Sequence, residues 1–209
     1  PGTMSMPGPP IETSEIFDPT VGDWAVTAPM TKGREFHKAV LLNDGRVMVV
    51  GGRGPISYLS SSEIYDPATA SWTAIANMAR ARTQHALVIL HDGRVLAIGG
   101  KVATYLDTAE AYDVETDVWT GAGNLSGQKA FLAATVLNDG RVLVTGGKRA
   151  GFQAVTESDI FDPADGSWSA AADMAIARRS HTSSLLPDGR VLVVGGYGID
   201  KTPTDSAEI

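Results

Sequence analysis

The chain has 209 residues, of which 43% are hydrophobic and 20% charged, an ordinary composition for a globular domain able to bury a core. Its formal net charge is −7 and no run of Lys or Arg forms a basic patch, which argues against a nucleic-acid partner because such proteins need clustered cations. Cysteine is absent, which excludes disulfides, thiolate metal sites and a cysteine nucleophile, and the apolar runs are only strand-length, so no membrane span is expected.

The chain opens on residues 1–12, which we interpret as a flexible tail or a remnant of the expressed sequence. Its first ten residues hold neither the basic region nor the hydrophobic stretch of a signal peptide. The 23 glycines and 11 prolines of the whole chain indicate many short elements joined by tight turns. We therefore expect the folded part to occupy residues 13–209.

Three markers recur in step along residues 13–209. Glycine pairs spaced 48, 47 and 49 residues apart are found at Gly51-Gly52, Gly99-Gly100, Gly146-Gly147 and Gly195-Gly196. The four tryptophans keep the same spacings, at Trp24, Trp72, Trp119 and Trp168. So do the turns Asp44-Gly45-Arg46, Asp92-Gly93-Arg94, Asp139-Gly140-Arg141 and Asp188-Gly189-Arg190. The period predicts repeats at about 13–60, 61–107, 108–156 and 157–205, with a fifth starting at 206–209.

Each repeat is predicted to supply four short strands. The first is apolar, as in residues 85–90, and ends at the Asp-Gly turn, a strong hairpin signal because glycine reaches positive φ at little cost. The second, as in residues 190–194, is apolar throughout and ends at the glycine pair. A variable loop leads to the third strand, as in residues 62–66, and a turn leads to the fourth, which holds the Trp. No segment has the periodicity of a helix.

The double glycine, an aromatic residue some 13 positions on and a Trp seven positions later resemble the kelch repeat. The aromatic residues in question are Phe17, Tyr65, Tyr112 and Phe161. The resemblance covers residues 13–209 and implies an all-β, kelch-type β-propeller of four tandem four-stranded antiparallel blades, related in fold to the central domain of galactose oxidase. The repeats are similar to bacterial kelch repeats of secreted and surface proteins, which favours an extracellular location. The alternative WD40 pattern lacks its Trp-Asp and Gly-His signatures here.

The strand count leaves the closure of the propeller open. The N-terminus supplies a third and fourth strand near residues 13–27, and the C-terminus a first and second near residues 181–196, which together would close a ring. However, residues 206–209 begin another third strand, which competes with residues 14–16 for one place. Three arrangements follow: a segment of a larger propeller, self-association to complete one, or a four-bladed ring.

The repeated residues are best explained by structure. We expect the Trp and Tyr or Phe side chains to pack between adjacent blades, and the glycine pairs to meet backbone requirements, since no helix follows them to form a phosphate loop. His37, His85 and His181 share one repeat position. They could converge on a channel and hold zinc or copper. Because Leu132 takes this position in the third repeat, we favour packing, and we expect no metal and no cofactor.

A basic residue lies three positions before each of these sites, at Arg34, Arg82, Lys129 and Arg178. A ring of cations at one channel mouth would suit anionic ligands. Carboxylates also recur, at Glu15, Glu63, Glu110 and Asp159. We therefore favour hydrogen bonds to carbonyls or pairing with a neighbouring blade's carboxylate, and exposed pairs of this kind contribute little to stability.

The loops that differ between repeats are the better candidates for ligand binding. Those between second and third strands carry aromatic residues that the repeat does not require, at Tyr58, Tyr105, Phe152 and Tyr197. Those that enter the first strand diverge at Phe36, Gln84, Phe131 and Arg179. Both sets should emerge on one face, because in an antiparallel blade the first strand starts where the second ends. These eight residues are the predicted binding site.

The favoured function is a non-catalytic recognition module that binds a protein or a glycan through this face. The alternatives are an enzyme at the channel mouth (a hydrolase, lyase or sugar isomerase) and a purely structural or engineered repeat scaffold. The Tyr–Cys copper cofactor of galactose oxidase relatives is impossible without cysteine. No nucleic-acid or membrane partner is expected.

Overall fold

The computed structural model describes residues 8–209, which form five antiparallel sheets. The chain starts with the hairpin β1 (Glu15–Asp18) and β2 (Asp23–Val26). Three four-stranded sheets follow: β3 (Lys38–Leu41), β4 (Val47–Val50), β5 (Ser62–Asp66), β6 (Ser71–Ile75); β7 (Ala86–Ile89), β8 (Val95–Ile98), β9 (Thr108–Asp113), β10 (Val118–Asn124); β11 (Ala133–Val136), β12 (Val142–Thr145), β13 (Ser158–Asp162), β14 (Ser167–Ala170). The last sheet holds β15 (Thr182–Leu185), β16 (Val191–Val194) and β17 (Ala207–Glu208).

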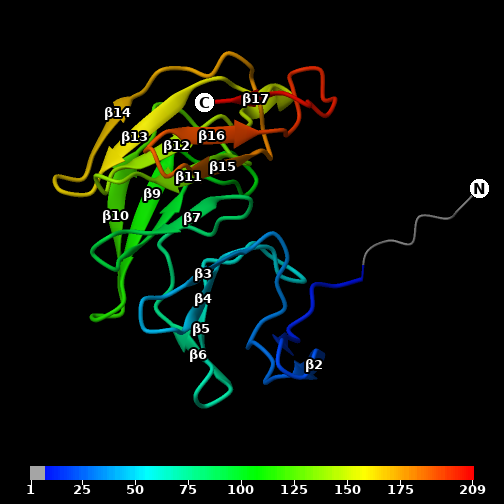
Figure 1. Ribbon diagram of the computed structural model, residues 1–209. Helices are drawn as coiled ribbons and strands as arrows, with labels where there is room; N and C mark the ends of the chain where they lie inside the picture. Colours follow the sequence, from blue (N-terminus) through cyan, green and yellow to red (C-terminus); the bar gives the residue numbers. More distant parts are fainter. Residues whose placement is uncertain (1–7) are drawn as a thin grey trace, which may run out of the picture.

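The sheets follow one another around an open arc, with the β1–β2 hairpin near one end and the sheet of β15, β16 and β17 at the other (Figure 1). The first strands β3, β7, β11 and β15 lie side by side in that order along the inner side of the arc. Within residues 8–209 the only helical element is the 3-10 turn Ala150–Phe152, and no helix there has the length and apolar character to cross a bilayer. The predicted all-β architecture of four-stranded antiparallel blades is confirmed. Each predicted repeat, which begins at a third strand, contributes to two of these sheets.

The last sheet excludes one of the three arrangements left open for closure of the propeller. The strand β17 pairs with β16 through Val193 and Glu208, so the chain's own C-terminal residues take the third-strand place. The β1–β2 hairpin instead packs beside the sheet of β3 to β6, where Trp72 Nε1 donates to Ser14 Oγ over 3.1 Å. The four-bladed ring is therefore not the arrangement this structure adopts.

The predicted tail is partly outside the described residues, since 1–7 are not among them. The last residues of the tail are held against a loop: the amide of Met30 donates to Glu12 O over 2.9 Å and that of Arg34 to Ile11 O over 3.2 Å. Met78 and Arg82 make the same two bonds to Ser60 and Leu59. Residues 11 and 12 thus occupy a place that belongs to the repeat.

The repeated aromatic residues connect one blade to the blade before it. In four of the five sheets a Trp ring lies 5.0–5.3 Å from the Tyr or Phe ring of the adjacent strand, measured between centroids. The indole N–H of Trp119 donates to Ala76 O over 3.0 Å, and that of Trp168 to Ala122 O over 2.7 Å. Both acceptors belong to the preceding blade. Trp24, in the first hairpin, is 63% exposed.

The glycine pairs connect each blade to the one after it. Gly51 and Gly52 have φ of +61° and +100°, and a Cβ on Gly51 would lie 2.4 Å from Arg82 O of the next blade. The amide of Gly52 donates to that same carbonyl over 2.9 Å. Only glycine supplies both the backbone conformation and the space for this contact.

Candidate functional site

A buried cation fastens each loop between a fourth strand and the next first strand to the sheet it enters. Arg82 Nη1 donates to Gly99 O over 2.7 Å and to Thr108 O over 2.9 Å, while Nη2 lies 2.6 Å from Glu110 Oε1. The other carboxylate oxygen accepts the amide of Ala79, in the same loop, over 2.6 Å. The two charged side chains are 0% and 7% exposed. The cation, the carboxylate and the loop amides thus satisfy one another's charge and hydrogen-bonding groups.

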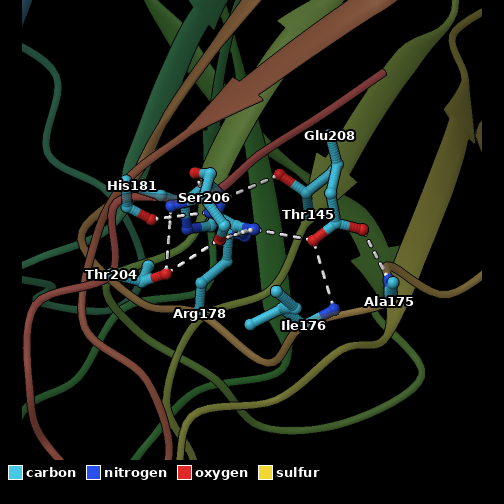
Figure 2. A network of polar contacts seen from close by, with 9 residues as sticks. Thr145, Ala175, Ile176, Arg178, His181, Thr204, Ser206 and Glu208 are labelled. Atoms are coloured by element: carbon cyan, nitrogen blue, oxygen red, sulfur yellow. Dashed lines mark hydrogen bonds and ion pairs between the residues drawn. The ribbon is translucent and has the colours of Figure 1, made fainter.

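The same clip recurs in the other sheets. Its pairs, with N–O distances of 2.6 to 2.7 Å, are Arg34–Glu63, Lys129–Asp159 and Arg178–Glu208. Figure 2 shows the last of them, in which Glu208 accepts from Arg178 and from the amides of Ala175 and Ile176. Glu208 was not among the predicted carboxylates, although it lies one repeat period after Asp159. Glu15, which was among them, is exposed on β1.

The prediction for these cations was right about pairing and wrong about its setting. The carboxylate belongs to the same sheet as the cation's loop, not to a neighbouring blade, and the pair is buried. The physical reason is that the loop folds back over the end of its own sheet and covers both groups. The ring of cations at a channel mouth is not formed either, since these side chains point into the blades.

His85 and His181, two of the three histidines at the shared repeat position, lie in separate seams between blades. A Cβ on Gly51 would lie 3.2 Å from His85 Cε1, and one on Gly146 would lie 2.9 Å from His181 Cε1. Leu132 Cδ2 has the equivalent place, 2.8 Å from a Cβ on Gly99. This geometry supports the packing interpretation. Among residues 8–209, no three His, Asp or Glu side chains form a group suited to a metal ion.

Burial sets the protonation of these two imidazoles. It lowers the pKa of His85 well below the ordinary value, and that of His181 to about 4, with the nearby arginine acting in the same direction. His181 Nε2 lies 2.9 Å from Thr145 Oγ1. Neither ring nitrogen of His85 has a hydrogen-bond partner. Both rings are therefore neutral at pH 7.

The two variable loop sets meet at one face, as the antiparallel topology predicts. The residue after each glycine pair bridges one residue from each set: Glu35, Arg53 and Tyr58; Thr83, Lys101 and Tyr105; Ala130, Lys148 and Ala154; Arg179, Tyr197 and Pro203. We call this end of the blades the loop face. The opposite end, which carries the Asp-Gly-Arg turns, is the turn face.

Four residues at the inner rim of the loop face have left-handed backbone conformations. Phe36, Gln84, Phe131 and Ser180 have φ of +53°, +54°, +58° and +54°. Backbone hydrogen bonds join them from blade to blade: Gln84 N to Phe36 O, Phe131 N to Gln84 O and Ser180 N to Phe131 O, over 3.2, 2.8 and 2.8 Å. For a non-glycine residue this conformation costs roughly 1–2 kcal/mol, and such residues cluster at functional sites.

These four residues line a pocket of about 400 Å³ where the first strands begin, together with His37, Lys38, His85, Leu132 and His181. The pocket unites three of the predicted site residues, Phe36, Gln84 and Phe131. Ser180 takes the place that we assigned to Arg179, and the repeat period from Phe131 would have identified it. Phe36 is 54% exposed, and Gln84 Oε1 is a buried acceptor without a partner.

The other predicted site residues surround this pocket without lining it. Tyr58 and Tyr197 are exposed in their loops and Tyr105 is half-buried. The guanidinium of Arg179 lies 4.8 Å from the Tyr197 ring centroid and 5.8 Å from that of Phe131. Phe152 ends the 3-10 turn, and its side chain lies outside what the structure describes.

The turn face has a hollow of its own, of about 490 Å³, lined by residues of the turns such as Asp44, Asp92 and Arg94. The arginines of these turns are paired within their own turns. Each turn arginine lies 2.6 or 2.7 Å from the aspartate two residues before it. This face repeats the same chemistry in every blade, whereas the loop face varies.

Two segments of the chain match a known repeat family. The Kelch motif matches residues 36–79 and 82–126, each of which runs from the loop-face rim through most of one blade. Residues 36–126 therefore carry two kelch repeats, and the fold of the chain is that of a kelch-type β-propeller. Kelch propellers are commonly binding modules.

Solved structures agree with this assignment of fold. The structure of YjhT, a kelch-type propeller, superposes with a TM-score of 0.79 at 14% sequence identity, over 93% of this chain and 71% of YjhT. At that identity the likeness concerns the fold alone. No curated protein matches the sequence of this kelch propeller.

Proposed function

We propose that this kelch propeller is a non-catalytic recognition module whose ligand, a protein or a carbohydrate, binds at the loop face. The observation that carries the proposal is the rim of four left-handed residues around the 400 Å³ pocket. A fold retains such strained residues where the surrounding structure over-determines them, which is typical of binding and catalytic sites.

The chemistry of the pocket favours recognition. Phe36 offers an exposed aromatic surface, and Gln84 Oε1 offers a buried acceptor that a ligand hydroxyl or amide could satisfy. Tyr58, Tyr105 and Tyr197 extend the aromatic surface outwards along the loops. Aromatic side chains of this kind supply much of the energy in protein and sugar recognition.

The enzyme alternative has less support. The carboxylates that recur in the blades, Glu63, Glu110 and Asp159, are engaged by buried cations and loop amides. A hydrolase of sugars would need two such groups facing a common substrate. The clips give these carboxylates a structural role instead.

A glycan and peptide array, followed by calorimetry on the best binder, tests the proposal. We expect Phe36→Ala with Phe131→Ala to weaken binding at least about tenfold, and Tyr58→Ala with Tyr197→Ala to weaken it less, because they lie outside the pocket. Arg46→Ala on the turn face is the control and should bind as the wild type does. Binding that survives alanine at all of these loop-face aromatic residues would show that the site is elsewhere.

Self-association to complete a propeller remains a separate prediction. Phe17 of the first hairpin is exposed, whereas its equivalents Tyr112 and Phe161 are buried, and Trp24 is exposed, whereas its equivalents Trp119 and Trp168 are half-buried. A neighbouring blade could cover them. The mass of the particle in solution, measured by light scattering, distinguishes a monomer from an assembly of copies.

A further inference from the structure

Three cations lie within about 6 Å of one aromatic ring at the middle of the loop face. Lys148 Nζ, Arg179 Cζ and Lys101 Nζ lie 5.6, 5.8 and 6.0 Å from the centroid of Phe131. Each contact is favourable by itself, since the face of an aromatic ring attracts cations. The three side chains come from three different loops of the loop face, so the ring collects positive charge from neighbouring blades. We call these three residues the Phe131 cation cluster.

The cations of this cluster also act on one another. The pKa of Lys148 lies below its ordinary value because of partial burial and because of the charges of Arg179 and Lys101. Like charges held around one ring repel, and a bound anion would offset that repulsion.

The cation cluster adjoins the pocket through Phe131, which belongs to both. A volume of about 400 Å³ suits a group of the size of one or two sugar rings. On the pocket side, Gln84 Oε1 needs a donor and Phe36 presents an exposed ring. A ligand that fits all three features carries a hydroxyl, an apolar ring face and an anionic group within a few ångströms.

We infer that the loop face binds an acidic carbohydrate, with a carboxylate among Lys101, Lys148 and Arg179 and a sugar ring in the adjoining pocket. A hydroxyl of the ring donates to Gln84 Oε1, and its C–H face packs on Phe36. An acidic peptide offers the charge but not the compact array of hydroxyls beside it. The inference rests on the proposed recognition role of this face and names its ligand class.

A panel of uronic-acid tetrasaccharides, their neutral methyl esters and a tetraglutamate peptide provides the test by calorimetry. The test variant is Lys101→Ala/Lys148→Ala/Arg179→Ala. Its control, Arg46→Ala/Arg94→Ala/Arg141→Ala, removes the same three charges from the turn face. A single Lys148→Gln variant keeps the test valid if the triple variant melts early.

We expect at least one uronic-acid tetrasaccharide to bind about tenfold more tightly than its methyl ester. The loop-face triple variant should lose that preference, Lys148→Gln should lose part of it, and the turn-face control should keep it. Equal binding of acid and ester, no binding by any uronic acid, tighter binding of tetraglutamate, or equal loss in both triple variants would overturn the inference. If Phe36→Ala with Phe131→Ala still abolishes binding of a neutral glycan or a peptide, the recognition role survives and only the ligand class is wrong.

Discussion

The two ends of a single blade hold arginine–carboxylate pairs of the same length and opposite character. In the blade of β7 to β10, Arg82 Nη2 lies 2.6 Å from Glu110 at the loop end, and Arg94 Nη2 lies 2.6 Å from Asp92 at the turn end. The first pair is 0% and 7% exposed, and the second 36% and 46%. Both recur around the arc, so neither distance nor repetition tells them apart. Burial does, because it decides what is left behind when one partner is lost.

The loop-end pair is part of what holds the recognition surface in place. Arg82 and Glu110 tie the loop that ends at Thr83 to its own sheet, and Gln84 on the pocket rim follows directly. The turn-end pair holds its own turn, and Arg94 Nη2 also donates to Pro163 O of the next blade over 3.2 Å, but it supports no loop of the recognition surface. Similar substitutions at the loop end and the turn end of a blade should therefore change the free energy of unfolding by different amounts.

The largest difference is expected between Arg82→Met and Arg94→Ala. Arg82→Met leaves the carboxylate of Glu110 buried without its cation, so the free energy of unfolding should fall by about 3–5 kcal/mol. Arg94→Ala should lower it by less than about 1 kcal/mol, since the lost pair is solvated. Urea unfolding of both variants measures the contrast, and similar losses at the two ends would contradict it.

Glycines at the two ends provide the next contrast. Gly51→Ala places a Cβ 2.4 Å from Arg82 O at φ +61°, and we expect the free energy of unfolding to fall by roughly 2–4 kcal/mol. Gly45→Ala, at φ +87° in the first Asp-Gly turn, meets nothing within 4 Å and should cost only about 1 kcal/mol. The same urea series measures both, and an equal cost would mean that the contact between blades is unimportant.

Lowering the pH should weaken the seams near the loop face before it affects the turns. His85 and His181 are neutral in the folded chain and have an ordinary pKa, near 6.5, in the unfolded one. Below pH 6.5 the unfolded state therefore binds more protons, and stability falls with decreasing pH by up to about 1.4 kcal/mol per histidine and pH unit. For His181 the loss should continue down to about pH 4.

The turn aspartates titrate lower. Hydrogen bonds from Arg141 hold the pKa of Asp139 below its ordinary value, so its contribution is present above that value and is lost only as the pH falls through the folded pKa. Unfolding curves between pH 7 and 4 measure the histidine window. A double variant, His85→Leu with His181→Leu, should flatten the slope, and an unchanged slope would contradict the assignment.

The smallest expected effect is an increase in the free energy of unfolding. Val50 and His85 occupy the repeat positions of Thr145 and His181, with Val50 one residue before a glycine pair, but Val50 has no hydroxyl to offer. Val50→Thr should supply the missing partner and raise the free energy of unfolding by about 1 kcal/mol. Thermal unfolding measures the gain, with Val194→Thr in the last sheet as the control. A lower melting temperature for Val50→Thr would show that the imidazole does not accept this bond.

Much of this architecture could be read from the sequence because the repeat fixes it. The glycine pairs, the Asp-Gly turns and the tryptophans specify strands and turns locally, and four-stranded blades follow. Pairing of Arg82 with a carboxylate was predicted, but its partner in the same sheet, Glu110, and the burial of the pair depend on how the loop folds over the sheet, which spacing does not encode. The pocket was half predicted: Phe36, Gln84 and Phe131 were chosen for their variability. Their left-handed conformation, the role of Ser180 and the convergence of Lys101 and Lys148 on Phe131 arise from the placement of neighbouring blades.

The most direct test of the account is a crystal structure of the protein with the tightest binder from the array. We expect ligand density at the loop face, in contact with Phe36, Gln84 and Phe131. Density in the hollow of the turn face, against Asp44 and Asp92, would contradict it.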